Sequence, residues 1–208
     1  VWNKEIGLRK QFGNNLFLEA SYFDFRLKDA IVRRQNESGQ EYFVNQGNTV
    51  QKGVELLLES KYFDLKNEFF SKLKFRFSGS FYHFKFDHYR QGNSDFSGND
   101  LTDVPSTTIN SLFNFVFFKK LVLDYSHFYT SKIPLNDANS VWSDSSLVGN
   151  IQFRYPFFVE KTRLNLQLQI QNLYNTEYVL GYDINAFGNR FYNPAAKRNF
   201  NFGVQIQF

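Results

Sequence analysis

The side chains of this chain that could act on a substrate as a catalytic set form one short group. Asp124, Ser126 and His127 supply the carboxylate, hydroxyl and imidazole that hydrolases use for nucleophilic catalysis. On a strand, positions 124 and 126 share a face while position 127 points to the other face, so the three side chains cannot form one hydrogen-bonded triad. The sequence also lacks G-x-S-x-G, H-E-x-x-H, a glycine-rich phosphate loop and cysteine pairs. We therefore expect neither an enzymatic activity nor a cofactor.

One segment has the oxygen ligands with which a calcium loop begins. Asn93, Asp95, Ser97 and Asp100 precede Val104, which stands where such a loop would place its closing glutamate. A solvated acidic loop is the favoured interpretation, and a calcium loop is the alternative. The histidines lack the spacing of a metal site: His83, His88 and His127.

Composition narrows the class of protein. The 208 residues carry a formal net charge of +4, and the basic residues form no block that could follow a phosphate backbone, so no nucleic-acid partner is expected. Aromatic residues make up 20% of the chain, yet mean hydropathy is −0.44 and no apolar run approaches the roughly 20 residues of a membrane-spanning helix. The chain has no methionine and opens on Val1, so we interpret it as a mature piece of a longer protein.

Apolar and polar residues alternate with a period of two along most of the chain, which predicts strands whose two faces meet different surroundings. At the end of the chain, Phe202, Val204 and Ile206 alternate with Gly203 and Gln205. The predicted strands cover residues 2–11, 16–33, 41–60, 71–87, 106–118, 121–132, 144–156, 162–178 and 197–208.

The connections between these strands alternate between short and long. The short ones span 13–15, 64–70, 119–120 and 157–161, and the long ones span 34–40, 88–105, 132–143 and 179–196. Tight turns at one rim and long loops at the other are typical of outer-membrane β-barrels.

Aromatic residues gather at both ends of the predicted strands, and two such belts match the interfacial girdles of a membrane barrel. The set beside the long loops comprises Phe23, Phe25, Phe84, Phe86, Phe128, Tyr129, Tyr174 and Tyr178. The polar faces carry Asn and Gln, with Lys72, Lys74, Arg76, Glu55 and Glu59 also predicted to point inward. A soluble antiparallel sandwich alternates too, but its solvated face would favour Lys and Glu over amides.

Four groups of residues resemble motifs in the C-terminal barrel region of TonB-dependent receptors, and the resemblance runs through essentially the whole chain. The first is the strand end from Tyr22 to Ile31. The other three comprise Asn45 and Gly47 with Gly53 and Glu55; Asn172, Leu173, Tyr174 and Asn175 with Tyr178; and Gly188, Arg190, Tyr192, Asn193 and Pro194 leading to Arg198, Phe200 and the terminal Phe208. A glycine in the second group would permit a bulge or a close approach of strands.

This resemblance implies an all-β, antiparallel up-and-down transmembrane barrel in the bacterial outer membrane. Large transporters of this type have about 22 strands, so residues 1–208 would be the C-terminal portion of one barrel domain, without the plug domain and the N-terminal strands. The implied function is the import of a bulky scarce nutrient, with a ferric siderophore as the default cargo and energy delivered through TonB. The implied partners are the bilayer, lipopolysaccharide, the TonB complex through the missing plug region, and the barrel-assembly machinery through the C-terminal strand.

Cargo contacts would then come from arginine, histidine and tyrosine residues near the long loops, because Arg grips anionic chelates and Tyr offers a flat face with a donor. The candidates are Arg33, Arg34, His88, Tyr89, Arg90, Tyr129, Tyr182 and Arg190. Two other functions stay open at this point. One is a passive porin or small barrel, and the other is a secreted β-sandwich that binds carbohydrate or surfaces.

Overall fold

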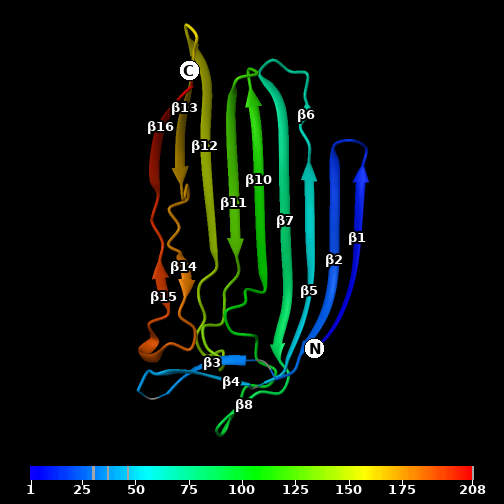
Figure 1. The fold of residues 1–208 in the computed structure, drawn as a ribbon, viewed down its shortest axis with the longest axis vertical. Coiled ribbons are helices and arrows are strands. Elements are labelled where there is room, and N and C mark those ends of the chain that lie inside the picture. The colour runs from blue at the N-terminus through cyan, green and yellow to red at the C-terminus, as the bar shows by residue number, and fades with distance from the viewer. Residues whose placement is uncertain (30, 37, 46, 208) are drawn as a thin grey trace.

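The chain folds into a single curved, antiparallel sheet (Figure 1). The computed structural model describes residues 1–29, 31–36, 38–45 and 47–207, and of residues 32–35, 44, 45 and 187 it describes only the backbone. Nine strands follow one another in sequence order across the sheet: β1 (Trp2–Phe12), β2 (Leu16–Leu27), β5 (Thr49–Ser60), β7 (Phe70–Phe86), β10 (Thr107–Phe117), β11 (Leu121–Thr130), β12 (Ser146–Val159), β13 (Thr162–Gln171) and β16 (Asn199–Gln207). A two-residue strand, β6 (Phe63–Asp64), pairs with β7 beside this path.

The nine predicted strands and their up-and-down order are confirmed, but three of the predicted strands are too long. The strand expected over 16–33 ends at Leu27, because Asp29 has a positive φ of 55°. The strand expected over 41–60 is interrupted at Gly47, whose φ of 90° lies outside the strand region. The strand expected over 162–178 ends at Gln171, since Asn172 also adopts a left-handed conformation.

The long connections contain small hairpins. These are β3 (Ile31–Gln35) with β4 (Glu41–Asn45), β8 (Arg90–Gln91) with β9 (Ser94–Asp95), and β14 (Val179–Tyr182) with β15 (Tyr192–Pro194), the last enclosing the single-turn helix η1 (Phe187–Asn189). In Figure 1 the long connections lie together at the lower end of the sheet and the short turns lie at the upper end. In the described part of the chain, no helix is both long and apolar enough to cross a membrane.

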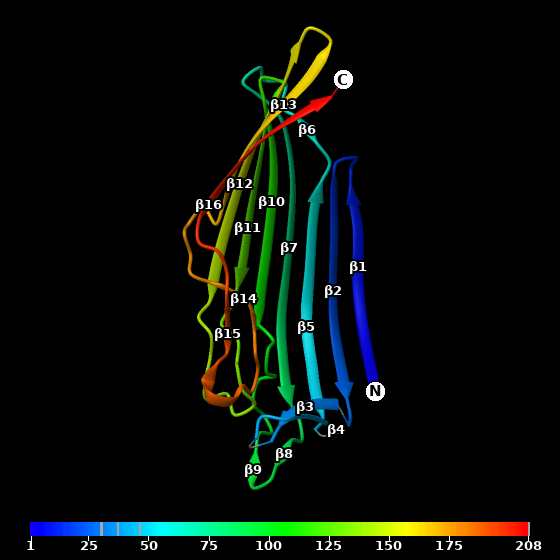
Figure 2. The same cartoon turned by 60° about the vertical axis from the view of Figure 1, so that its left-hand side comes forward.

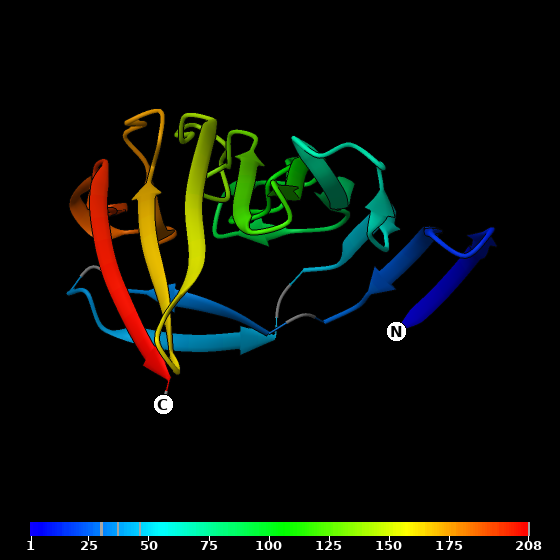
Figure 3. The same cartoon turned by 90° about the horizontal axis from the view of Figure 1, so that it is seen from above.

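Curvature gives the sheet two unlike faces. Seen from above in Figure 3, the strands form an arc, and the β3–β4 hairpin runs along its open side. Figure 2 shows the accompanying twist, with β12 and β16 leaning away from the direction of β1 and β2. We call the concave side the inner face and the convex side the outer face.

The inner face is polar. A row of directly opposed residues crosses it from Glu59 through Arg76, Leu112 and Ser126 to Asn150. These five residues line a hollow of about 480 Å³ on this side of the sheet. The predicted inward position of Glu55, Glu59, Lys74 and Arg76 agrees with this register, because opposed residues of antiparallel strands share a face.

The outer face is apolar. A row of directly opposed residues crosses it from Phe75 through Phe113, Tyr125 and Ile151 to Ile170 and Phe200. Large apolar side chains stay exposed along this face, with Phe200 at 66%, Phe202 at 72% and Ile206 at 53%. A second sheet packed on these side chains would have defined a sandwich, but the described strands form one layer, so the sandwich alternative is wrong.

The buried hydrophobic core lies in the loops. Ile133, Leu135 and Phe191 form it, and Val141, Tyr182 and Ala186 pack against it. A single-layer sheet with an exposed apolar face and a small core at one rim is the distribution that a membrane barrel requires, since lipid replaces the second layer.

Candidate functional site

Three long connections fold together into one unit at the lower rim. We call residues 87–106, 131–145 and 172–198 the loop cap. Backbone hydrogen bonds join its parts: the amide of Asp103 donates to the carbonyl of Pro134 at 3.0 Å, and the amide of Asn185 donates to the carbonyl of Leu135 at 2.9 Å. These bonds connect segments about 30 and 50 residues apart in sequence, so the cap is a tertiary structure rather than three independent loops.

Asp137 is the polar centre of the loop cap. Its carboxylate accepts hydrogen bonds from the Tyr89 hydroxyl at 2.8 Å, the Thr102 hydroxyl at 2.6 Å and the Asn185 side-chain amide at 3.2 Å. The Asp137 backbone amide in turn donates to the Asn185 side chain at 3.0 Å. Asp137 is 7% exposed, and burial of a polar group is costly unless it is hydrogen-bonded. Through these bonds this one residue ties all three connections together.

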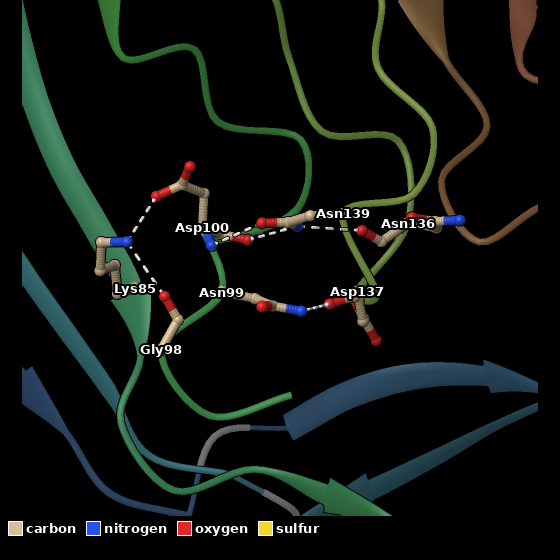
Figure 4. Close-up of polar contacts among 7 residues, drawn as sticks. All are labelled: Lys85, Gly98, Asn99, Asp100, Asn136, Asp137 and Asn139. Atoms are coloured by element: carbon tan, nitrogen blue, oxygen red, sulfur yellow. Dashed lines mark hydrogen bonds and ion pairs between the residues drawn. The ribbon is translucent and has the colours of Figure 1, made fainter. Parts of the chain in front are cut away.

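Asparagine side chains make a second set of bonds in the loop cap, drawn in Figure 4. Asn139 accepts from the Asp100 amide at 2.7 Å and donates to the Asp100 carbonyl at 2.9 Å, which imitates a pair of strand bonds. The Asn99 side chain donates to the carbonyl of Asp137 at 2.8 Å. Lys85, at the end of β7, donates to the carbonyl of Gly98 at 3.0 Å and lies 3.2 Å from the Asp100 carboxylate. The cap is thereby fixed to the sheet.

Two hollows lie among the described residues of the cap. One of about 420 Å³ lies between residues 144–146 and the β14–β15 hairpin, and Tyr178, Tyr182, Tyr192, Glu177 and Lys197 line it. The other, about 200 Å³, lies where the cap meets the sheet, and its lining includes Tyr82, Phe84, Lys132 and Trp142. The Lys132 ammonium lies 4.7 Å from the centre of the Trp142 ring, which is a cation–π distance. Both hollows offer aromatic faces beside a cation.

Specific surroundings shift the pKa values of three carboxyl groups in the cap. Hydrogen bonds from Ser97, followed by the Arg90 guanidinium, lower the pKa of Asp95 to about 2. A hydrogen bond from Lys197, at 2.6 Å, lowers the pKa of Glu177. Burial raises the pKa of Asp103. The cap therefore presents ion pairs at its surface.

The long-loop aromatic belt expected from the sequence is partly wrong. Strand register places five of its members on the inner face, in line with Glu55, Arg76 and Ser126: Phe23, Phe25, Phe84, Phe86 and Phe128. Phe23 contacts both Tyr82 and Phe84 there, with ring centres 6.0 and 5.9 Å apart. These rings form an aromatic patch in the interior, because positions near a strand end alternate between the faces as strictly as positions in its middle.

The predicted cargo residues occupy several different positions. His88 and Arg190 are exposed in the loop cap, and Tyr182 lines the larger hollow. Arg90 is exposed and pairs with Asp95 at 2.9 Å. The side chains of Arg33 and Arg34 lie outside the described residues. Tyr89 and Tyr129 differ from expectation and are treated next.

Tyr89 and Tyr129 do not face the interior. Tyr89 is 1% exposed and stacks on Phe86 at 4.6 Å while its hydroxyl bonds to Asp137, so it anchors the loop cap instead of meeting a ligand. Tyr129 lies on the outer face, opposite Ile109 and Leu147. The catalytic group also separates as predicted, with Asp124 and Ser126 on the inner face and His127 on the outer face.

The residues of the calcium-loop alternative make contacts with other groups of the loop cap. Asp95 receives the Arg90 guanidinium and the Ser97 amide, while Asp100 lies beside Lys85. Asn93 stands in the turn of the β8–β9 hairpin. Nowhere in the described ranges do three or more His, Cys, Asp or Glu side chains gather as a metal site would need.

Each family-like glycine of the second group makes room for an aromatic ring. A Cβ atom on Gly53 would lie 2.7 Å from both Phe23 and Tyr82, and one on Gly47 would lie 2.9 Å from Tyr89. Glu55 accepts the Tyr82 hydroxyl at 2.7 Å. The strand register is continuous at Gly53, so the close approach is between backbone and rings, and no bulge occurs there. The side chain of Asn45 lies outside the described residues.

The third and fourth groups hold the large loop between β13 and β16. Asn172 is 1% exposed, and its side chain exchanges hydrogen bonds with the backbone of Thr176 at 2.8 and 2.9 Å. The backbone amides of Leu173 and Ala195 donate to the carbonyls of Gly149 and Tyr178, and the amide of Arg198 donates to the Asn175 side chain. Asn193 and Pro194 pair with β14. Gly188 has a positive φ of 71°. Phe208 lies outside the described residues. These motif residues are structural.

Several residues of the site were not found by sequence reasoning. Asp137, Asn185 and Thr102 carry no local pattern, since their partners are about 35 to 50 residues away. Tyr192 and Lys197 line the larger hollow, and Lys132 and Trp142 line the smaller one. The only signal in the sequence was the richness of these loops in Asn and Asp, residues that bond to backbone groups in irregular structure.

Comparison with known proteins agrees with this architecture. The family model described as "TonB dependent receptor-like, beta-barrel" matches residues 1–173. No curated protein sequence matches the chain. Similar solved structures include the siderophore receptor PiuA from Acinetobacter baumannii, with a TM-score of 0.73 at 22% identity over 97% of this chain and 28% of that chain. The ferric yersiniabactin uptake receptor FyuA from Yersinia pestis gives 0.70 at 17% identity, over 99% of this chain and 30% of that chain.

The similarity therefore covers nearly all of this chain but only part of each of the solved structures. The chain spans less than a third of the length of these receptors, and its open arc corresponds to part of a barrel wall. The family model matches most of the chain, and a piece of such a barrel accounts for both the curved antiparallel sheet and the polar inner face. The chain belongs to the TonB-dependent receptor β-barrel family.

Proposed function

We propose that the chain is the C-terminal wall of an outer-membrane receptor that imports a ferric siderophore or a similar bulky chelate with energy delivered through TonB. In this proposal, residues 1–208 are one part of a single barrel domain, and a plug domain and further strands complete it. TonB engages the plug region, and the C-terminal strand engages the barrel-assembly machinery. The receptor spans the bacterial outer membrane, with the loop cap outside the cell.

The observation that carries this proposal is the family match over residues 1–173 together with the arrangement of the faces. Apolar residues on the outer face suit lipid, and the inner face presents a polar wall to an aqueous interior. On that wall, Asp124 accepts two bonds from Arg154, at 3.0 and 2.6 Å, and one from Asn114 at 2.5 Å. Such a connected network keeps charges inside a barrel without leaving an unpaired ion.

Cargo would meet the loop cap and the aromatic patch beneath it. Tyr182 and Tyr192 approach each other with ring centres 5.9 Å apart beside the larger hollow. Lys132 and Trp142 border the smaller one. A ferric chelate is bulky, commonly anionic and rich in flat groups, so cations and aromatic faces are suitable contacts. His88, Arg190, Arg33 and Arg34 stay candidates on the same reasoning.

The test is transport by the full-length receptor in a strain that lacks its own siderophore receptors. Uptake of radioactive iron, offered as a panel of ferric siderophores, should require both the receptor and TonB. The variant Tyr182→Ala/Tyr192→Ala should reduce uptake and binding of the accepted cargo by roughly tenfold or more, since each lost aromatic contact costs on the order of 1 kcal/mol.

The matched control removes an aromatic ring from the outer face. Tyr155→Ala should leave cargo uptake unchanged, because Tyr155 lies opposite Leu166 on that face. Uptake that continues without TonB would contradict the proposal and favour a passive porin. Failure to take up any ferric chelate, with normal surface expression, would contradict the choice of cargo.

A further inference from the structure

The larger hollow of the loop cap combines aromatic rings with carboxylates. Its volume of about 420 Å³ lies within the range of small-molecule sites. The rings belong to Tyr178, Tyr182 and Tyr192, and the carboxylates belong to Asp144 and Glu177. Tyr182 and Tyr192 are a directly opposed pair of the β14–β15 hairpin, with ring centres 5.9 Å apart, so they project from the same face of that hairpin.

The charges of this hollow leave it negative. Glu177 is paired with Lys197 at 2.6 Å, so these two groups compensate each other. The Asp144 side chain is exposed, and among the described residues its carboxylate has no hydrogen-bond or ion-pair partner. One uncompensated negative charge therefore remains beside three tyrosine rings.

The hairpin that carries these rings is held against the start of β12. The Thr176 hydroxyl donates to the carbonyl of Leu147 at 2.6 Å. The amide of Ala195 donates to the carbonyl of Tyr178 at 3.0 Å and closes the base of the hairpin. The hairpin is thus fixed beside residues 144–146 before a ligand arrives, and such preorganisation lowers the entropy cost of binding.

This combination of groups suits an organic cation. The face of a tyrosine ring attracts an ammonium group that lies within about 6 Å of the ring centre, and cages of aromatic rings bind alkylammonium ligands in this way. A free carboxylate adds Coulombic attraction. An anion would be repelled by Asp144, and a hard metal ion would need several oxygen ligands instead of ring faces.

We infer that the larger hollow binds an alkylammonium group carried by the cargo, so that the receptor prefers chelates with a positively charged arm. Rings alone would accept any flat or apolar group, whereas Asp144 adds a preference for positive charge. The smaller hollow differs, because Lys132 there places the protein's own cation against the Trp142 ring. The inference rests on the proposed function, since it specifies the chemical class of the imported chelate.

The first test probes the hollow alone with tetramethylammonium. Saturation-transfer NMR on the purified full-length receptor in nanodiscs measures its binding, and tert-butanol serves as a neutral molecule of similar size. Tetramethylammonium should bind and tert-butanol should not. Asp144→Asn and Tyr192→Leu should each weaken binding of tetramethylammonium by roughly two- to fivefold, which is the value of one exposed ion pair or cation–π contact.

Asp183→Asn is the matched control for Asp144→Asn. It removes the same charge from the exposed end of β14, but Asp183 does not line the hollow, so binding should stay unchanged. Asp144 is exposed and Tyr192 is 53% exposed, so none of these variants should lower the urea midpoint of the receptor.

The second test uses a whole chelate. A ferric trihydroxamate with a terminal ammonium group and the same chelate acetylated at that nitrogen differ in this one charge. The unmodified receptor should bind the ammonium form roughly tenfold more tightly, since several ring contacts act together with the carboxylate. Asp144→Lys should reverse the preference, because it repels the ammonium form and leaves the acetylated form unaffected.

The inference fails if tetramethylammonium binds no better than tert-butanol, if Asp144→Asn and Tyr192→Leu leave its binding unchanged, or if the two chelate forms bind equally. Tetramethylammonium that binds as tightly as the chelate would make the hollow a site for free amines, which would also overturn the assignment to cargo. Normal binding of tetramethylammonium with no binding or uptake of any ferric chelate would instead count against the proposed function, so the two failures can be told apart.

Discussion

Glycine residues in this sheet lie under aromatic rings. Gly53 lies beneath Phe23 and Tyr82 on the inner face, and Gly149 lies beneath Tyr174 on the outer face. The Tyr174 hydroxyl is hydrogen-bonded to the Tyr125 hydroxyl and to the His127 imidazole. An aromatic ring can pack directly against the backbone only at a residue that has no Cβ. Glycine is required at these two positions because the ring occupies the space of a Cβ, and not because of the backbone dihedral angles.

Gly149→Ala should destabilise the barrel by about 1 to 3 kcal/mol, because the new Cβ would lie 2.6 Å from the Tyr174 ring and would displace it. The measurement is the urea midpoint of the full-length receptor in lipid vesicles. Gly181→Ala is the control, since nothing lies within 4 Å of a Cβ there. Equal stability of the two variants would refute the packing argument.

Ionisation of Asp95 should govern the β8–β9 hairpin at low pH. Its pKa of about 2 is depressed first by Ser97 and then by Arg90, relative to a usual 3.8. A depressed carboxyl pKa contributes stability that is present above about pH 4 and is lost as the pH falls through about 2. The carboxyl carbon of Asp95, followed by NMR, should titrate near pH 2.

Substitution of Ser97 and of Arg90 tests which of these two partners lowers the pKa of Asp95 more. Ser97→Ala should raise the pKa of Asp95 more than Arg90→Gln does, because the side-chain hydrogen bond from Ser97 is the largest single cause and the backbone bond from residue 97 remains in both variants. An unchanged pKa in Ser97→Ala, or a larger change in Arg90→Gln, would show that the order of the causes is different.

Among the elements, the long connections behave as one folded unit. The loop cap has its own apolar core around Leu135, which is 0% exposed, and its own polar centre at Asp137. The strands supply only anchoring points such as Lys85 and Phe86. A loop assembly with a core can hold a ligand surface in a fixed shape, which short flexible loops cannot do.

Asp137→Ala should loosen the whole loop cap, because it leaves the Tyr89 and Thr102 hydroxyls and the Asn185 amide without their acceptor. Each buried polar group left unpaired costs about 1 to 3 kcal/mol. Hydrogen exchange should therefore quicken in all three connections while the strands stay protected. Asp144→Ala, which removes an exposed carboxylate from the same connection, should have no effect. Faster exchange confined to residues near 137 would argue against a cooperative cap.

At the scale of the whole molecule, the fold is a wall between lipid and an interior. Its outer face keeps large apolar residues exposed along the final strands, and its inner face carries amides and paired charges. The described strands form a single layer and enclose no core of their own, so the surroundings on each side decide which substitutions are tolerated.

Val204→Arg and Gln205→Arg test this division with neighbouring residues on opposite faces of β16. Val204 lies opposite Leu166, whereas Gln205 lies opposite Asn165. The first change should destabilise folding into lipid by roughly 2 to 4 kcal/mol at the bilayer midplane, and by less toward the headgroups, while the second should be tolerated. Folding equilibria in vesicles measure both. Equal damage would mean that the two faces have been assigned wrongly.

The sequence by itself determined the strands, their order and their two faces. The alternation of apolar and polar residues with a period of two is visible within each strand. The alternation of short and long connections is visible along the chain. Motifs such as Gly53 with Glu55 also pointed to the family, because their spacing is visible along the chain. These features need no knowledge of distant contacts.

Only the tertiary structure decided the composition of the site. Tyr89 looked like a ligand contact and proved to be buried against Asp137, 48 residues away. Phe23 and Phe84 looked like an interfacial belt, and register placed them inside. The loop cap and the two hollows depend on pairings between segments far apart in sequence. Local patterns carry no information about such pairings, since their energy arises only after the chain has closed on itself.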